Sequence, residues 1–75
     1  GPRMLNGAEA GELKDLLQAT VQASEAVHFS SPEARERWGM GRIMPVLRGR
    51  VPAEDVLNGL RDAWSPAGEV SRGRR

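Results

Sequence analysis

The sequence predicts an all-α fold, a small bundle of three to four short helices with a disordered basic C-terminal tail. Three observations predict this class: apolar residues recur every three or four positions, no stretch alternates as a strand does, and helix start and stop residues divide the chain. A chain of 75 residues buries only roughly 60% of its unfolded surface. We therefore expect one small helical domain, at residues 6–65, with a marginal core.

The first predicted helix runs from about Ala8 to Phe29. Asn6 is the expected N-cap, and the acids that follow it favour the positive end of the helix dipole. Pro32 prevents the helix from continuing. The predicted apolar face comprises Leu13, Leu16, Leu17, Thr20, Val21, Ser24 and Val27.

Ser31-Pro32-Glu33 is the start signal of a second helix, with a capping serine, a proline in the first position and an acid in the first turn. We expect this helix to cover Ala34 to Trp38. Gly39 and Gly41 each cost about 1 kcal/mol in a helix interior, and Pro45 fits best in the first turn of a new helix. A break near Gly41 is therefore favoured, and one longer helix kinked at Pro45 is the alternative.

The last predicted helix is opened by Pro52 and stopped by Ser65-Pro66, after a turn at Gly49. Gly59 lies within it, where another backbone could pack closely. The apolar face of this helix comprises Val56, Leu57, Leu60, Ala63 and Trp64. The predicted core of the domain is Leu13, Leu16, Leu17, Val21, Val27, Phe29, Trp38, Ile43, Met44, Val46, Leu47, Val56, Leu57, Leu60 and Trp64.

Both ends of the chain are expected to lie outside the domain. Gly1-Pro2 resembles the scar that protease cleavage leaves after expression, and we exclude it from the fold. Residues 66–75 lack apolar periodicity and carry three arginines, which predicts a disordered basic tail.

Charge is unevenly distributed, although the formal net charge is only +1. Residues 35–50 carry five arginines against one glutamate, whereas residues 1–34 are acidic. Arginine suits planar partners such as phosphate and carboxylate. Codon usage in a GC-rich genome is the alternative source of this arginine excess. The basic segment is the candidate binding strip, made of Arg35, Arg37, Arg42, Arg48 and Arg50.

The residues needed for most enzyme chemistry are missing, so we expect a protein that is not an enzyme, with no cofactor and no metal. There is no cysteine and only one histidine. His28 is expected at the end of the first helix, where it would interact with the negative end of the dipole. Because no signal peptide and no membrane-spanning run is visible, we expect a cytoplasmic protein without membrane contact.

The two tryptophans, Trp38 and Trp64, are expected to anchor the core. The alternative is that one of them is an exposed anchor for a partner, since tryptophan is enriched in binding hot spots. Trp64 is the better candidate for that role because it lies near the edge of the domain.

From Gly41 onward the sequence reads GRIMPVLRGRVPAEDV, in which two glycines frame an aliphatic-methionine pair and an apolar helix follows. This stretch resembles the last part of the GatB/YqeY domain, the helical tail of the B subunit of tRNA-dependent amidotransferases. The likeness covers about a third of the 75-residue chain. The matching positions are Gly41, Ile43, Met44, Gly49, Arg50 and Val56.

The resemblance implies an all-helical bacterial module that helps to hold tRNA by shape and charge, without catalysis of its own. Gly41, Met44, Gly49 and Arg50 would then have structural or RNA-facing roles, and Pro52 would open the helix that follows the turn. The chain departs from the family pattern at Pro45, where the family continues a helix, and it lacks the common lysines.

A second, shorter resemblance concerns Arg48-Gly49-Arg50-Val51-Pro52. It is similar to the turn of Lsr2-type actinobacterial nucleoid proteins, whose arginines insert into the minor groove of AT-rich DNA. That resemblance implies minor-groove binding through Arg48 and Arg50, a contact that a narrow groove favours electrostatically.

We therefore expect a non-catalytic binding module that recognises RNA, with tRNA favoured, through the arginine strip. The alternative is a docking domain that pairs with a partner helix or forms a homodimer through residues 8–29. Both remain open, because Lys14 is the single lysine and nucleic-acid binders usually mix lysine with arginine. The expected dimer seam comprises Leu13, Leu17, Val21 and Ser24.

Overall fold

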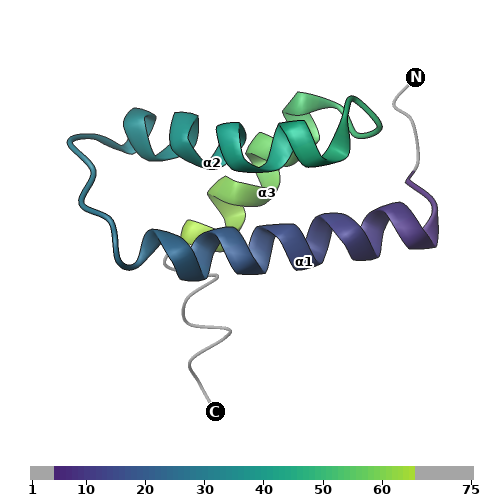
Figure 1. The fold of residues 1–75 in the computed structure, drawn as a ribbon, viewed down its shortest axis with the longest axis horizontal. Coiled ribbons are helices and arrows are strands. Elements are labelled where there is room, and N and C mark those ends of the chain that lie inside the picture. The colour runs from purple at the N-terminus through teal and green to yellow at the C-terminus, as the bar shows by residue number, and fades with distance from the viewer. Residues whose placement is uncertain (1–4, 66–75) are drawn as a thin grey trace, which may run out of the picture.

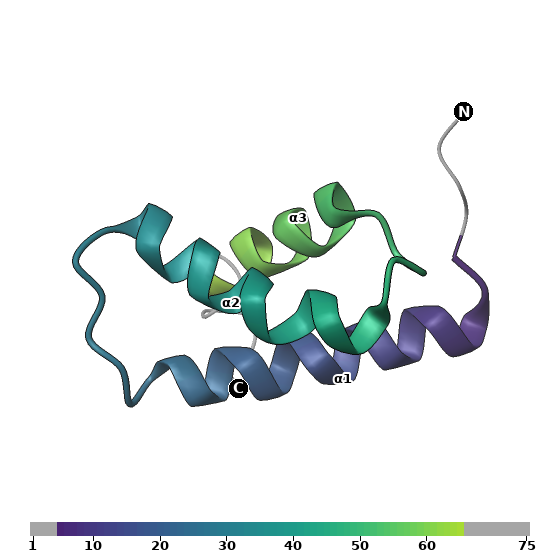
Figure 2. The same cartoon turned by 45° about the horizontal axis from the view of Figure 1, so that its top comes forward.

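The protein folds into three helices with no strand in the described part of the chain, which confirms the predicted all-α class. The structure is a computed structural model and describes residues 5–65. Helix α1 spans Gly7–Ser24, α2 spans Pro32–Leu47 and α3 spans Ala53–Trp64. Figure 1 shows α1 and α2 running alongside each other, with α3 crossing behind them. Each helix packs against both of the others, and the turned view in Figure 2 shows α3 beside α2.

Helix α1 begins with a capping box, which confirms Asn6 as the N-cap. Asn6 Oδ1 accepts from the backbone N–H of Glu9 at 2.8 Å, and Glu9 Oε1 accepts from the backbone N–H of Asn6 at 3.3 Å. Two N–H groups that the first turn would leave without a partner are thereby satisfied.

The predicted end of this helix at Phe29 is wrong, because α1 ends at Ser24. The next N–H groups, of Glu25, Ala26 and Val27, bond carbonyls three residues back, which tightens the chain into a turn. Val27 is 39% exposed as a result, and its predicted place in the core is wrong.

Helix α2 starts as predicted, with Ser31 Oγ accepting from the N–H of Ala34 at 3.1 Å and Pro32 in the first turn. The favoured break near Gly41 is wrong: one helix runs through to Leu47 with Pro45 inside it. Its register buries Ile43 and Leu47 to 0% and 1% exposure, and this packing outweighs the weak helix propensity of the glycines. Val46 turns outward and is 47% exposed, so its predicted burial is also wrong.

The turn between α2 and α3 carries the backbone into left-handed conformations. Arg48 has φ 53° and Gly49 has φ 81°, and the N–H of Arg48 bonds the carbonyl of Met44 at 2.9 Å. This arrangement ends α2 in the way that left-handed caps commonly do. It confirms the predicted turn at Gly49. Pro52, which was predicted to open the last helix, is the N-cap of α3, and the helix itself begins at the next residue.

The core lies where the three helices meet, and its centre is Ile43, Val56 and Leu60, each at 0% exposure. Val51, at 1% exposure, also belongs to it although it lies in the turn and was not predicted. Of the remaining predicted core residues, Leu16, Leu17, Trp38 and Met44 are partly buried and pack against this centre.

Two glycines allow the helices to approach closely. A Cβ on Gly39 would lie 2.9 Å from Leu60 Cδ1 and 3.0 Å from Trp64 Cη2, so α2 and α3 require glycine there. A Cβ on Gly59 would lie 2.7 Å from Leu17 Cδ1. The close neighbour of Gly59 is therefore a side chain of α1. The prediction that another backbone packs against Gly59 is wrong.

Candidate nucleic-acid interface

The five arginines of the predicted strip lie on more than one side of α2 and its C-terminal turn. A helix turns about 100° per residue, so Arg35 and Arg42, seven residues apart, share one side. Arg37 lies about 200° from Arg35, on the opposite side. It is in line with Gly41 and Met44, which follow it at intervals of four and seven residues, and Arg48 is the C-cap just after the last turn of α2. Four of the arginines thus form two separate groups, Arg50 belongs to neither, and there is no continuous strip.

The first group is held against the two tryptophans. The guanidinium carbon of Arg35 lies 4.4 Å from the ring centroid of Trp64, and that of Arg42 lies 4.9 Å from the ring of Trp38. Phe29 meets Trp38 edge-on, with ring centroids 5.3 Å apart. Arg35 is half-buried, and its Nε is buried without a hydrogen-bond partner among the described residues. These contacts favour a packing role for Arg35, with Arg42 covering Trp38 from the solvent side.

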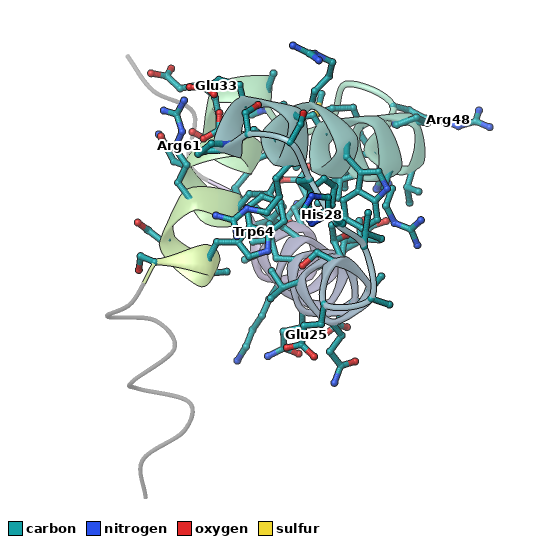
Figure 3. All side chains as sticks on the ribbon, turned by 90° about the vertical axis from the view of Figure 1, so that its left-hand side faces the viewer. Glu25, His28, Glu33, Arg48, Arg61 and Trp64 are labelled. Carbon is teal, nitrogen blue, oxygen red and sulfur yellow. The ribbon has the colours of Figure 1, made fainter. Side chains whose placement is uncertain are left out.

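Trp64 belongs to the core and not to the exposed surface. It is 8% exposed, and its Nε1 donates to Ser24 Oγ at 3.0 Å. Ser24 Oγ in turn donates to the carbonyl of Val21 at 2.6 Å. Figure 3 shows Trp64 between the helices. This burial agrees with the core interpretation of Trp64 and leaves it unable to act as an exposed anchor.

Arg50 is held within the molecule by several bonds. Its Nε donates to the carbonyl of Leu47 at 3.0 Å, and one terminal nitrogen, NH2, lies 3.0 Å from Glu12 Oε2. The same nitrogen lies 3.5 Å from the carbonyl of Val46. Arg50 therefore joins the α2–α3 turn to α1, and a ligand would have to compete for its guanidinium.

The second group presents its charge to solvent. Arg37 and Arg48 are exposed, and neither forms an ion pair with any acid among residues 5–65. Figure 3 shows Arg48 extending away from the bundle. Glu33, one turn before Arg37, lies at the start of the same line. We call the exposed surface of Arg37, Gly41, Pro45 and Arg48 the α2 face.

Gly41 is the unusual member of the α2 face. It is exposed, and a Cβ built on it would meet nothing within 4 Å. Unlike Gly39, it has no packing requirement inside the described part of the protein, although alanine there would favour the helix by up to about 1 kcal/mol. Met44, one turn later, is half-buried and reaches the core. The α2 face therefore has no side chain at Gly41, and it carries a positive charge at Arg37 and another at Arg48.

Sequence reasoning missed a second cross-helix arginine pair. Arg61 binds Glu36 through two bonds, Nε to Oε2 at 2.9 Å and NH2 to Oε1 at 3.1 Å. The hydrogen bond from Arg61 holds the pKa of Glu36 below its usual range, and Glu36 raises the pKa of Arg61. The two residues lie 25 positions apart, and only the packing of α2 on α3 brings them together.

The other predicted features carry no chemistry in the described part of the chain. His28 is exposed and lies four residues beyond the end of α1, so its expected interaction with the last turn is corrected. Within residues 5–65 no three acidic or histidine side chains gather in a way that could hold a metal ion. None of the three helices is long and apolar enough to cross a membrane. The basic tail, residues 66–75, lies outside the described residues.

Comparison with known proteins gives no relative from which a function could be transferred. No protein-family model matches the chain. Searches of the curated proteins and of the solved structures also give no match.

Proposed function

We propose that this chain is a non-catalytic helical module that binds RNA, with tRNA as the preferred class, through the α2 face. The observation that carries the proposal is the exposed Gly41 between Arg37 and Arg48, two arginines without acidic partners in the described part of the chain. A glycine that costs helix stability and serves no internal packing leaves room for the backbone of a ligand.

The chemistry of this surface suits a sugar–phosphate backbone. Guanidinium groups bind phosphate oxygens in a two-pronged geometry. Helical RNA is recognised chiefly by its shape and by contacts to phosphates and 2′-hydroxyls. The bare backbone at Gly41 can fit the shape of an RNA helix, and the arginines beside it can bind its phosphates. The preference for tRNA rests on the resemblance of residues 41–56 to the amidotransferase tail domain, to which Gly41 and Met44 contribute.

Minor-groove DNA binding through Arg48-Gly49-Arg50 receives less support. That mode requires both arginines to enter the groove together. In the free protein the Arg50 guanidinium is occupied by Glu12 and by the carbonyl of Leu47. Duplex DNA is therefore the comparison ligand in the test of RNA binding.

The test is a titration with bulk tRNA and with duplex DNA at two salt concentrations. Phosphate contacts release counterions, so affinity should fall steeply as salt rises. Arg37→Ala and Arg48→Ala should each weaken tRNA binding and each lower the salt slope by about 1. Lys14→Ala, which removes one positive charge from α1, is the matched control and should leave the slope unchanged. Binding that ignores salt, or α2-face variants that bind normally, would refute the proposal.

A docking function is the second candidate, and one feature favours it: an apolar groove lies along α1 on the side where α3 packs. The groove is lined by Leu13, Leu17 and Val21 of α1 together with Gly59 and Ala63 of α3. Helix-in-groove binding commonly uses such a surface. The predicted dimer through residues 8–29 belongs to this candidate.

A further inference from the structure

The groove beside α1 has a volume of about 800 Å³, and its floor is mainly apolar. Leu17 is half-buried, whereas Leu13 and Val21 are 9% and 6% exposed. Three residues of α3 also line it, Gly59, Asp62 and Ala63, and the side chain of Leu17 lies against Gly59. A second helix could lie along this side, in contact with both α1 and α3.

Two charged residues of α1 that line the groove have opposite sign. Lys14 lies part of the way along it, with Ala10 and Leu5 continuing the lining beyond, and Glu25, the residue that caps α1, lies at its other end. Lys14 and Glu25 are eleven residues apart, which is close to three full turns and about 16 Å along the helix axis. Neither forms an ion pair within residues 5–65. Asp62 adds a second acid to the Glu25 end, because the Trp64–Ser24 hydrogen bond holds the end of α3 beside the end of α1.

We infer that the groove is occupied by a second copy of this chain, with the two α1 helices antiparallel. A twofold axis near Gln18 and Val21 places Lys14 of each protomer opposite Glu25 of the partner subunit, so one symmetry operation forms both Lys14–Glu25 pairs. A parallel arrangement would place like charges together. This inference rests on the docking candidate and is independent of RNA binding, because the groove lies on α1 and not on the α2 face. Figure 3 shows Glu25 and Arg48 at well-separated places on the bundle.

The seam differs from the one expected from sequence. Ser24 does not line the groove, and its hydroxyl is bonded to Trp64. The inferred contact is shifted around α1 to Lys14, Gln18, Val21 and Glu25. Because this surface mixes polar with apolar side chains, we expect weak association, with a dissociation constant on the order of tens of micromolar.

The test is sedimentation equilibrium over a dilution series, carried out without nucleic acid. The wild-type protein should pass from 8.2 kDa towards twice that mass as concentration rises. Lys14→Glu and Glu25→Lys should each weaken association roughly fivefold or more, since each places like charges at both ends of the seam. The double exchange, Lys14→Glu with Glu25→Lys, should restore wild-type association. Asp15→Lys is the matched control, since Asp15 is exposed and does not line the groove.

Three outcomes would overturn the inference. The first is a protein that stays monomeric at about 1 mM, because exposed pairs and a small apolar seam should associate well below that concentration. The second is association that neither single exchange weakens. The third is a double exchange that stays as weak as the single variants while circular dichroism shows a folded bundle. Loss of tRNA binding by α2-face variants would leave all three readouts unchanged.

Discussion

At the residue scale, two glycines in α2 serve opposite purposes although only one residue separates them. Gly39 is buried and lies against Leu60 and Trp64, so it allows two helices to meet. Gly41 is exposed and touches nothing within 4 Å of the position that a Cβ would take. Helix propensity is the same at both positions, and only the surroundings differ. Substituting each in turn therefore separates internal packing from surface function.

Gly39→Ala should destabilise the protein. The added methyl would overlap Leu60, which is 0% exposed and has little room to move. Overpacking of this kind typically costs about 1–3 kcal/mol, which outweighs the gain of about 1 kcal/mol in helix propensity. Gly41→Ala should instead raise the melting temperature. Thermal melting followed by circular dichroism compares the two variants, and a shift of both melting temperatures in the same direction would contradict the different roles of Gly39 and Gly41.

Leu60→Ala should cost roughly 2–5 kcal/mol of unfolding free energy, because it empties a fully buried site. Leu60 is 0% exposed and lies on the same face of α3 as Val56 and Trp64. In a domain of this size, such a loss can unfold the protein. Chemical denaturation checks the value, and an unchanged midpoint would show that α3 does not pack on the core as described.

At the element scale, the helices are joined by a few specific contacts in addition to the apolar core. Arg61 of α3 binds Glu36 of α2 with both prongs of its guanidinium, and Arg50 connects the α2–α3 turn to Glu12 of α1. The Arg61 side chain is 55% exposed and that of Glu36 is 24% exposed. Because the pair lies at the surface, its contribution is modest and depends on salt.

The Glu36–Arg61 pair should make stability depend on pH. The folded-state pKa of Glu36 is lowered, chiefly by the hydrogen bond from Arg61. Its contribution is therefore fully present above the ordinary glutamate pKa of about 4.3 and is lost as the pH falls through the lower, folded-state value. Glu36→Gln should reduce the melting temperature at pH 7, and the difference from wild type should shrink towards pH 2. Asp15→Asn is the control. A difference that stays constant with pH would contradict the assigned role of the pair.

The N-terminal ends of α1 and α2 could be predicted, because a local capping signal specifies each of them. Asn6 with Glu9, and Ser31 with Pro32, cap helices through contacts within four residues, so the sequence is enough to locate them. The continuity of α2 could not be predicted, because Ile43 and Leu47 gain their burial from α1 and α3. The burial of Val51 was not predicted either, because this residue lies in the turn between α2 and α3 and belongs to no helical repeat.

The candidate site was predictable in composition but not in arrangement. The arginines of residues 35–50 are evident in the sequence. Their division into an exposed face and a tryptophan-packed side depends on α2 being one helix, since a break near Gly41 would change where Arg37 lies relative to Arg42 and Arg48. The binding of Arg50 by Glu12 depends on a contact between residues 38 positions apart, which no local pattern indicates.

At the scale of the whole molecule, the protein is a small three-helix bundle with two separate candidate surfaces. The α2 face is basic and has no side chain at Gly41, whereas the groove beside α1 is mainly apolar and is lined by Lys14 and Glu25, which carry opposite charges. Gly41 lies on the α2 face together with Arg37 and Arg48, whereas the equally exposed Gly11 lies on α1, which carries no arginine. For this reason we propose that Gly41, and not Gly11, serves contact with RNA.

The most direct test of this claim is tRNA affinity in a series with a growing side chain at position 41. Gly41→Ala and Gly41→Leu should both stabilise α2, yet weaken tRNA binding stepwise, by several-fold and then by about tenfold or more, which is about 1.4 kcal/mol. Gly11→Ala and Gly11→Leu are the matched controls, because Gly11 is also exposed, helical and without neighbours within 4 Å. They should bind tRNA as the wild type does. If the position-41 variants bind tRNA with unchanged affinity, the α2 face is not the RNA-binding surface.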